Sequence, residues 1–272
     1  MRSYFKIALM KKEKEKETFA STMKLFEYRY DLRTVFDDFL TMSLCAMGIN
    51  PLIRKSYDED LYLQTVAKYK DDKLRFEFPH LYAHVITEMT DRLDSGEGYD
   101  VLGEFYEQNL YRKGASQYFT PWQICIFMAQ ATAEQAKENT EGKTGASLRI
   151  LDPCCGSGRM LLASQKVNGQ HHEYYGVDID HTCVKMTALN LIMSGLFHSE
   201  ALCADALIPE DFSMSYRTSF LPFGVFRIQE KENSPLWHML KNSWDRPEPK
   251  APKPEYDGVT SKYSDGSQLQ IF

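Results

Sequence analysis

A short glycine-containing segment between two apolar runs restricts the folds open to this chain more than any other feature. The largely apolar run 148–151 leads directly into Asp-Pro-Cys-Cys-Gly-Ser-Gly at residues 152–158. A second apolar run ends in Asp178, twenty residues after Gly158. A strand, a glycine turn that opens a helix, a second strand and an acid at its tip form the nucleotide-type pocket of an open α/β sheet. The spacing therefore predicts an α/β fold.

The order of the glycines indicates the kind of ligand. The pattern is Asp-x-x-x-Gly-x-Gly and not the Gly-x-Gly-x-x-Gly of dinucleotide folds. A carboxylate at the strand tip, here Asp152, suits a cationic amino group better than a pyrophosphate. S-adenosylmethionine pairs such an amino group with a ribose, which makes it the leading candidate for the ligand.

Three motifs together carry a family resemblance. Gly-Ala-Ser-Gln-Tyr-Phe-Thr-Pro at 114–121 precedes the glycine loop by about thirty residues, and Gly-Val-Asp-Ile-Asp follows it at 176–180. With the loop itself, they resemble the adenine-N6 DNA methyltransferases, most closely the modification subunits of type I restriction systems. The resemblance covers residues 100–210. It implies a Rossmann-like S-adenosylmethionine methyltransferase sheet, DNA binding, and DNA methylation within restriction-modification.

The resemblance also implies which residues bind the cofactor. Asp152 would take the methionine ammonium through a charge-assisted bond, and Asp178 would accept both ribose hydroxyls. Asp205 would meet the adenine amino group, although an acid at that position is also typical of a helix N-cap or a turn. Thr120 would bond near the methionine moiety. The full set of predicted cofactor-binding residues is Tyr118, Thr120, Pro121, Asp152, Pro153, Gly156, Gly158, Asp178, Ile179 and Asp205.

One family motif is missing. Relatives carry Asn-Pro-Pro-Phe or Asn-Pro-Pro-Tyr at the tip of the fourth strand, where the Asn oxygen and a proline carbonyl hold the target amino group of a flipped base. The corresponding window here is Phe220, Leu221, Pro222 and Phe223, and no Asn-Pro-Pro or Asp-Pro-Pro occurs in the chain. Phenylalanine has no acceptor for an amino proton. The catalytic residues are therefore unknown, and we expect catalysis to be weak, partner-dependent or absent.

Three functions remain open at this point. The chain is an adenine-N6 DNA methyltransferase that uses a divergent motif or completes its site with a partner. Alternatively, it is a non-catalytic protein that binds S-adenosylmethionine and acts in regulation or assembly on DNA. The third function, methylation of a protein amide, normally uses Asn-Pro-Pro-Tyr as well and so gains nothing from the loss.

Composition limits the partners. With 272 residues, 43% of them apolar, the chain is long enough for one α/β domain with a helical extension. It contains neither an apolar run of membrane-spanning length nor a secretion signal, so we expect a cytoplasmic protein without a membrane partner. The net charge is −6 and no Lys/Arg cluster is present, which weighs against tight DNA binding by the chain alone. Sequence specificity is expected to come from a partner subunit.

Cysteine and histidine spacing predicts no metal site. The six cysteines show no Cys-x-x-Cys pairing and are expected to be reduced and mostly buried. His80 and His84 share a helix face at i,i+4, but no third ligand accompanies them.

Apolar periodicity divides the chain into three parts: an N-terminal helical region (1–112), the methyltransferase-like domain (113–244) and a flexible Pro/Lys tail (245–272). Helices are expected over 18–48, 58–70, 79–93, 100–112, 122–138, 158–167, 181–194 and 229–244. Strands are expected over 148–152, 174–178 and 200–204, with a fourth over 219–228. The sheet would be truncated after this, which leaves an edge that must be covered.

The last five residues, Gln268-Leu269-Gln270-Ile271-Phe272, resemble the short motif by which bacterial proteins bind the replication sliding clamp. In that case Gln268, Leu269, Ile271 and Phe272 would be the clamp contacts. The alternative is that Ile271 and Phe272 cover the open edge of the sheet.

Overall fold

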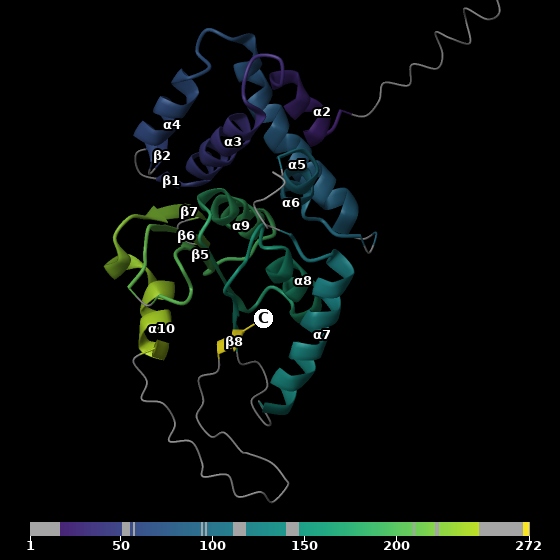
Figure 1. Ribbon diagram of the computed structural model, residues 1–272, viewed down its shortest axis with the longest axis vertical. Helices are drawn as coiled ribbons and strands as arrows, with labels where there is room; N and C mark the ends of the chain where they lie inside the picture. Colours follow the sequence, from purple (N-terminus) through teal and green to yellow (C-terminus); the bar gives the residue numbers. More distant parts are fainter. Residues whose placement is uncertain are drawn as a thin grey trace, which may run out of the picture.

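The protein is an α/β structure built on a six-stranded mixed sheet of order β7-β6-β5-β4-β3-β8 (Figure 1). The computed structural model describes residues 17–50, 55–56, 58–93, 95, 97–110, 118–139, 147–208, 210–220, 223–244 and 269–271. The α/β fold predicted from the glycine segment is thereby confirmed.

The parallel half of the sheet forms from the short apolar runs. It consists of β3 (Arg149–Asp152), β4 (Glu173–Asp178), β5 (Glu200–Cys203) and β8 (Leu269–Ile271). In register, Asp152 lies opposite Gly176 and Asp178 opposite Cys203. The carboxyl ends of β3, β4 and β5 therefore meet at one edge of the sheet.

Helices cover both faces of this sheet. The helix α8 (Arg159–Asn168) contacts β3 and β4, α9 (His181–Met193) contacts β4, β5 and β6, and α7 (Trp122–Asn139) packs against α8. The opposite face packs against α10 (Pro235–Trp244). Successive strand side chains alternate between faces, so Ile150 joins the core with α8 and α9 while Leu151 joins the core with α10.

The N-terminal helices form the upper layer in Figure 1. They are α2 (Phe19–Met23), η1 (Lys24–Phe26), α3 (Leu32–Met47), α4 (Glu59–Ala67), η2 (Lys73–Glu77), α5 (Phe78–Leu93), α6 (Val101–Phe105) and the π-helical turn η3 (Tyr106–Leu110), with a small hairpin of β1 (Ile49–Asn50) and β2 (Lys55–Ser56). The apolar pattern over 18–48 is interrupted because Asp31 caps a new helix by accepting the Thr34 N–H at 2.9 Å. One hydrophobic core runs through these helices and the sheet.

The fourth strand differs from the prediction. Residues 219–228 do not form one strand: they belong to an antiparallel hairpin of β6 (Met214–Phe220) and β7 (Phe223–Ile228). The expected helix over 229–244 is the short turn η4 (Lys231–Asn233) followed by α10, because the Ser234 hydroxyl starts a new helix by accepting the Trp237 N–H at 3.0 Å.

The position next to β3 is occupied by β8, which runs parallel to it with Leu151 opposite Ile271. The predicted clamp residues Gln268 and Phe272, and the predicted boundary at residue 112, lie outside the described residues. Among the helices described, none is long and apolar enough to span a bilayer.

Candidate functional site

Three acids gather at the carboxyl edge of the parallel strands. Asp152 ends β3, Asp178 ends β4, and Asp205 lies two residues beyond β5. Partial burial of the thiol raises the pKa of Cys154, and the nearby carboxylates of all three acids add to the shift. The structure thus brings the predicted acids together, and their roles toward a cofactor stay predictions.

The glycine loop between β3 and α8 depends on its glycines for its own shape. Gly156 and Gly158 have φ angles of 54° and 81°, in the left-handed region. A β-carbon on Gly156 would lie 2.7 Å from the ring of Phe119, and one on Gly158 would lie 3.1 Å from Thr187. Larger residues at either position would therefore displace the loop from the acid edge.

Asp152 is a nearly buried carboxylate. Its side chain accepts the Cys154 N–H at 3.1 Å, and the residue is 8% exposed. Burial raises the pKa of Asp152 to about 6, and the nearby negative charge of Asp178 adds to the shift. A cation bound here would offset this cost, which is why the site favours an ammonium group over an anion.

Asp178 is half-buried, and its carboxylate contacts the glycine loop. One oxygen accepts the Gly156 N–H and the other accepts the Asp180 N–H, both at 2.9 Å. Burial raises the pKa of Asp178 as well, although these two backbone donors oppose the shift. Each carboxylate oxygen has a further lone pair, so Asp178 is able to accept two ligand hydroxyls while it holds the loop.

Asp205 has the turn role that was one of its two interpretations. Its carboxylate accepts the Leu207 N–H at 2.9 Å, and its own N–H donates to Asp211. Leu207 is 76% exposed and Ile179, beside Asp178, is 73% exposed. Ile208 is also exposed, so apolar side chains follow both Asp178 and Asp205. Ile179 was predicted from the sequence, whereas Leu207 and Ile208 were not, although two apolar residues shortly after a strand-tip acid are visible in the sequence.

The segment before α7 forms the other wall of the site. The Thr120 carbonyl accepts from Arg159 Nη1 at 3.3 Å and from the Cys125 thiol, so its backbone is the part held in place. Tyr118 and Pro121 are exposed, and Pro153 is half-buried. Phe119, which was not among the predicted site residues, packs its ring against Gly156.

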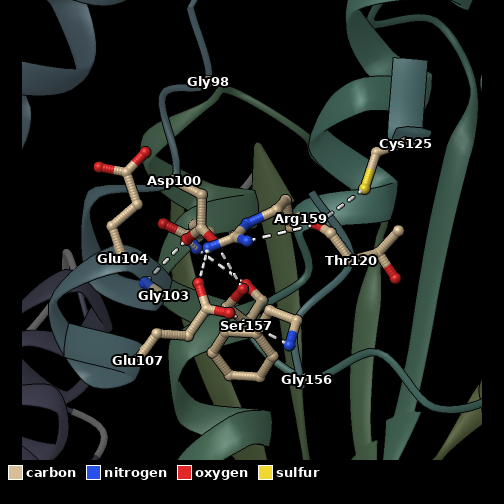
Figure 2. Close-up of polar contacts among 12 residues, drawn as sticks. Gly98, Asp100, Gly103, Glu104, Glu107, Thr120, Cys125, Gly156, Ser157 and Arg159 are labelled. Atoms are coloured by element: carbon tan, nitrogen blue, oxygen red, sulfur yellow. Dashed lines mark hydrogen bonds and ion pairs between the residues drawn. The ribbon is translucent and has the colours of Figure 1, made fainter. Parts of the chain in front are cut away.

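A buried polar network behind the loop was also missed (Figure 2). Asp100, at the start of α6, accepts from Ser157, Arg159, Gly103 and Asn190. The Arg159 guanidinium also donates to Glu107 at 2.8 Å. Ser157 lies inside the glycine motif and Arg159 directly follows it, and neither was among the residues predicted from the sequence.

The window expected to replace the amino-group motif lies at the wrong edge. Glu200 pairs with Arg217 and Cys203 with Met214, so β6 runs from the acid edge to the opposite edge of the sheet. Phe220 and Phe223 lie there, 55% and 52% exposed, and their rings contact Phe197. Leu221 and Pro222 lie outside the described residues. The predicted register of this motif at a parallel strand tip is therefore wrong.

Two other features carry no site. A cleft of about 470 Å³ lies between α3–α4 and α9–β6, but its Lys185 is paired with Asp37 and its Lys68 with Asp38. His80 contacts Glu77 at 3.0 Å, and no metal-binding group of three His, Cys, Asp or Glu residues is found in the described part of the chain. All six cysteines are free, and Cys154 is exposed while the others are buried.

Comparison with known proteins shows the family of the chain. Residues 97–233, half of the chain, match the family N-6 DNA Methylase. Over 198 residues the chain is 25% identical to the methylase subunit of the type I restriction enzyme MpnII from Mycoplasma pneumoniae, covering 68% of this chain and 35% of that subunit. The match thus spans about a third of that relative's length.

Two solved structures are also similar. One is a type I restriction-modification methyltransferase subunit from Streptococcus thermophilus, 14% identical, with a TM-score of 0.32 over 65% of this chain and 55% of that one. The other is a putative class I S-adenosylmethionine-dependent methyltransferase from Listeria monocytogenes, 13% identical, with a TM-score of 0.30 over 61% and 51% of the two chains.

Proposed function

The chain belongs to the N-6 DNA methylase family, and from this premise we propose that it binds S-adenosylmethionine at the acid edge and contributes to adenine-N6 methylation of DNA with a partner subunit. S-adenosylmethionine is the methyl donor of this family and the cofactor of the chain. The observation that carries the proposal is the pair of carboxylates on either side of the glycine loop, the buried Asp152 and the half-buried Asp178.

The residues of the edge fit the parts of this cofactor. Asp152 would take the methionine ammonium, because a buried carboxylate gains most from a cation. Asp178 would accept the ribose hydroxyls, Asp205 the adenine amino group, and the exposed apolar side chains of Ile179 and Leu207 would flank the adenine ring.

At the other end, the Tyr118–Pro121 segment would close the site beside the methionine. Bound there, the cofactor supplies a transferable methyl group.

We propose that the group that holds the target amino group comes from a partner. The chain has no Asn-Pro-Pro sequence, and the Phe220–Phe223 window lies across the sheet from the acid edge. The negative net charge of the chain, −6, likewise favours DNA contact through a partner subunit. The isolated chain is therefore expected to transfer little or no methyl to DNA.

Calorimetric titration with S-adenosylmethionine and S-adenosylhomocysteine tests the cofactor proposal. Binding of both ligands supports it, and absence of binding up to millimolar concentration contradicts it. A methyl-transfer assay on mixed DNA, with and without host extract, then tests catalysis. Robust transfer by the purified chain, abolished by Asp152→Ala, would show that this chain carries its own amino-group site.

The second candidate is a non-catalytic S-adenosylmethionine-binding protein that acts in regulation or assembly on DNA. It is favoured by the same position of the hairpin, because Phe220 supplies no acceptor at the acid edge. This candidate predicts cofactor binding without methyl transfer even when host extract is present, so the same pair of assays separates the two.

For residues 268–272 we propose that they cover the open edge of the sheet, an arrangement we call the seal, and that they are not a ligand of the sliding clamp. The pairing of β8 with β3 supports it, since this pairing occupies the backbone of Arg149–Leu151. A clamp ligand predicts instead that the free pentapeptide competes for purified bacterial clamp at micromolar strength, about 8 kcal/mol. It also predicts that Phe272→Ala costs much of that affinity. Such competition would contradict the seal and show instead that Gln268, Leu269, Ile271 and Phe272 bind the sliding clamp.

A further inference from the structure

We infer that Arg159, Glu107 and Asp100 form a positioning clamp that fixes the two walls of the cofactor site, the glycine loop and the Phe119–Thr120 segment, relative to one another. None of the three was selected from the sequence. The inference rests on the proposed cofactor function, because it assigns to these residues control of the affinity for that cofactor.

Arg159 connects the start of α8 to the α6–η3 region and to the segment before α7, both of which lie at least 39 residues earlier in the chain. Its Nε donates to Asp100 at 2.9 Å, its Nη2 to Glu107 at 2.8 Å, and its Nη1 to the Thr120 carbonyl at 3.3 Å. The side chain is 10% exposed, and Figure 2 shows it lying between these partners. A planar guanidinium with five donors is able to make all three contacts at once, and a lysine is not.

Asp100 is the fixed end of the clamp. It is 1% exposed, and each of its oxygens accepts two hydrogen bonds. One oxygen accepts from Ser157 at 2.5 Å and Arg159 at 2.9 Å, and the other from Gly103 and Asn190, both at 2.9 Å. The carboxylate therefore ties α6 and α9 to the middle of the glycine loop. Four donors thus converge on the one carboxylate of Asp100, and a buried network of this kind holds its members in one geometry.

Glu107 is the partly exposed end. One of its oxygens accepts from Arg159, and the other accepts the backbone N–H of Phe119 at 3.2 Å. The Phe119 ring packs on Gly156, and the Arg159 guanidinium lies 5.5 Å from the ring centre. The two walls thus touch at Phe119 and Gly156, and the Arg159–Glu107 pair holds this contact closed.

Charge keeps the clamp intact near neutral pH. Burial by itself lowers the pKa of Arg159, but the carboxylates of Asp100 and Glu107 outweigh it and raise that pKa. Glu107 is only partly buried, with a side chain 33% exposed, and without it the Arg159 guanidinium keeps its ion pair with Asp100. We therefore expect loss of Glu107 to loosen the two walls more than it lowers the stability of the fold.

The consequence is a cost of ordering. A loop and a segment that move independently must be fixed when the cofactor binds, and this fixing reduces affinity. The clamp removes that cost in advance. Its loss is expected to weaken S-adenosylmethionine and S-adenosylhomocysteine alike, because both ligands require the same separation of the walls.

The test is a double-variant cycle on the full chain. Glu107→Gln and Arg159→Lys are each expected to raise the Kd for S-adenosylhomocysteine about tenfold, measured by calorimetry at 15 °C. The double variant should lose about tenfold and not about a hundredfold, since either change alone opens the same contact. Hydrogen exchange at the Gly156 and Phe119 amides should become faster in each variant.

The matched control is the exposed pair Arg149 and Glu173, 3.2 Å apart at the start of β3 and β4. Arg149→Lys and Glu173→Gln are expected to change the Kd less than twofold. If Arg159→Lys does not fold, Glu107→Gln decides alone. Wild-type affinity in Glu107→Gln, or a hundredfold loss of affinity in the double variant, would contradict the positioning role of Arg159 and Glu107. Absence of binding by the wild-type chain would contradict the proposed function instead.

Discussion

The parallel strands β3–β5 and the β6–β7 hairpin end at opposite edges of one sheet, and the side chains at those edges differ in kind. The parallel strands end in Asp152, Asp178 and the turn of Asp205, with glycine-loop amides between them. The hairpin turns between Phe220 and Phe223, two half-exposed rings that contact Phe197.

Strand direction explains the difference. Every parallel strand delivers the residues that follow it to the same edge, so polar loops accumulate where a ligand binds. An antiparallel strand delivers them to the other edge. Because β6 is antiparallel to β5, the residues that follow β6 lie at the opposite edge of the sheet from the acids, however well their spacing fits a motif. A motif therefore has meaning only together with the direction of its strand.

The largest expected effect comes from Asp178→Ala. The change removes an acceptor for two ribose hydroxyls, each worth roughly 1.5–3 kcal/mol to a charged acceptor. We expect the Kd for S-adenosylmethionine to rise more than a hundredfold in calorimetry. Phe220→Ala is the control at the opposite edge. The contrast between the edges fails if the two variants weaken binding equally.

The next effect is the pH dependence of Asp152. Burial raises its pKa to about 6, and only its ionised form attracts the ammonium of the ligand. Affinity for S-adenosylhomocysteine should therefore increase as the pH rises through about 6, and fall about tenfold per pH unit well below it. In Asp152→Asn the affinity should be low and nearly independent of pH between 5 and 8. A wild-type profile that is flat over this range would contradict the ammonium contact.

Stability should change in the opposite sense. A carboxyl whose pKa is raised on folding stabilises the fold fully below its unfolded value near 3.8, and this contribution is lost as the pH rises through about 6. At pH 8 the ionised, buried Asp152 therefore costs stability, and Asp152→Asn should be more stable by on the order of 1–3 kcal/mol. Thermal unfolding at pH 4 and pH 8 measures this, since the gain should be small at pH 4.

The two edges also differ in how well they were predicted. The strands β3, β4 and β5 and the helices after Gly158 and Asp180 were expected within one or two residues, because short apolar runs and the glycine pattern determine them locally. The hairpin was placed wrongly because spacing to the Asp205 turn was read without strand direction. The Asp100 network was missed for another reason: its side-chain partners lie 57 to 90 residues away, and no periodicity marks a polar side chain that becomes buried.

A smaller effect is expected from deletion of residues 268–272, which removes β8. The deletion exposes the side of β3 that faces away from β4 and leaves the Arg149–Leu151 backbone unpaired on that side. We expect a loss of about 1 kcal/mol or more and a melting temperature lower by several degrees. Thermal unfolding of the truncated and full chains measures it. Unchanged stability, together with no binding of the pentapeptide to the clamp, would remove both the seal and the clamp contact.

The smallest effect on the acid edge is expected from the hairpin. The pair of changes Phe220→Asn and Leu221→Pro rebuilds the first two residues of the family motif in sequence. Because β6 ends across the sheet from Asp152, the new amide does not reach a bound cofactor, and we expect neither methyl transfer nor a change in Kd above twofold. Loss of the Phe220 ring contact with Phe197, 5.2 Å between centres, should cost about 1 kcal/mol of stability.

The matched control is Phe223→Ala, which removes the neighbouring ring contact without adding an amide. Both variants should lose similar stability and keep the same cofactor affinity. Methyl transfer to DNA that appears only in the Phe220→Asn, Leu221→Pro variant would mean that the hairpin reaches the acid edge in the working protein. The direction of β6 would then no longer separate the two edges.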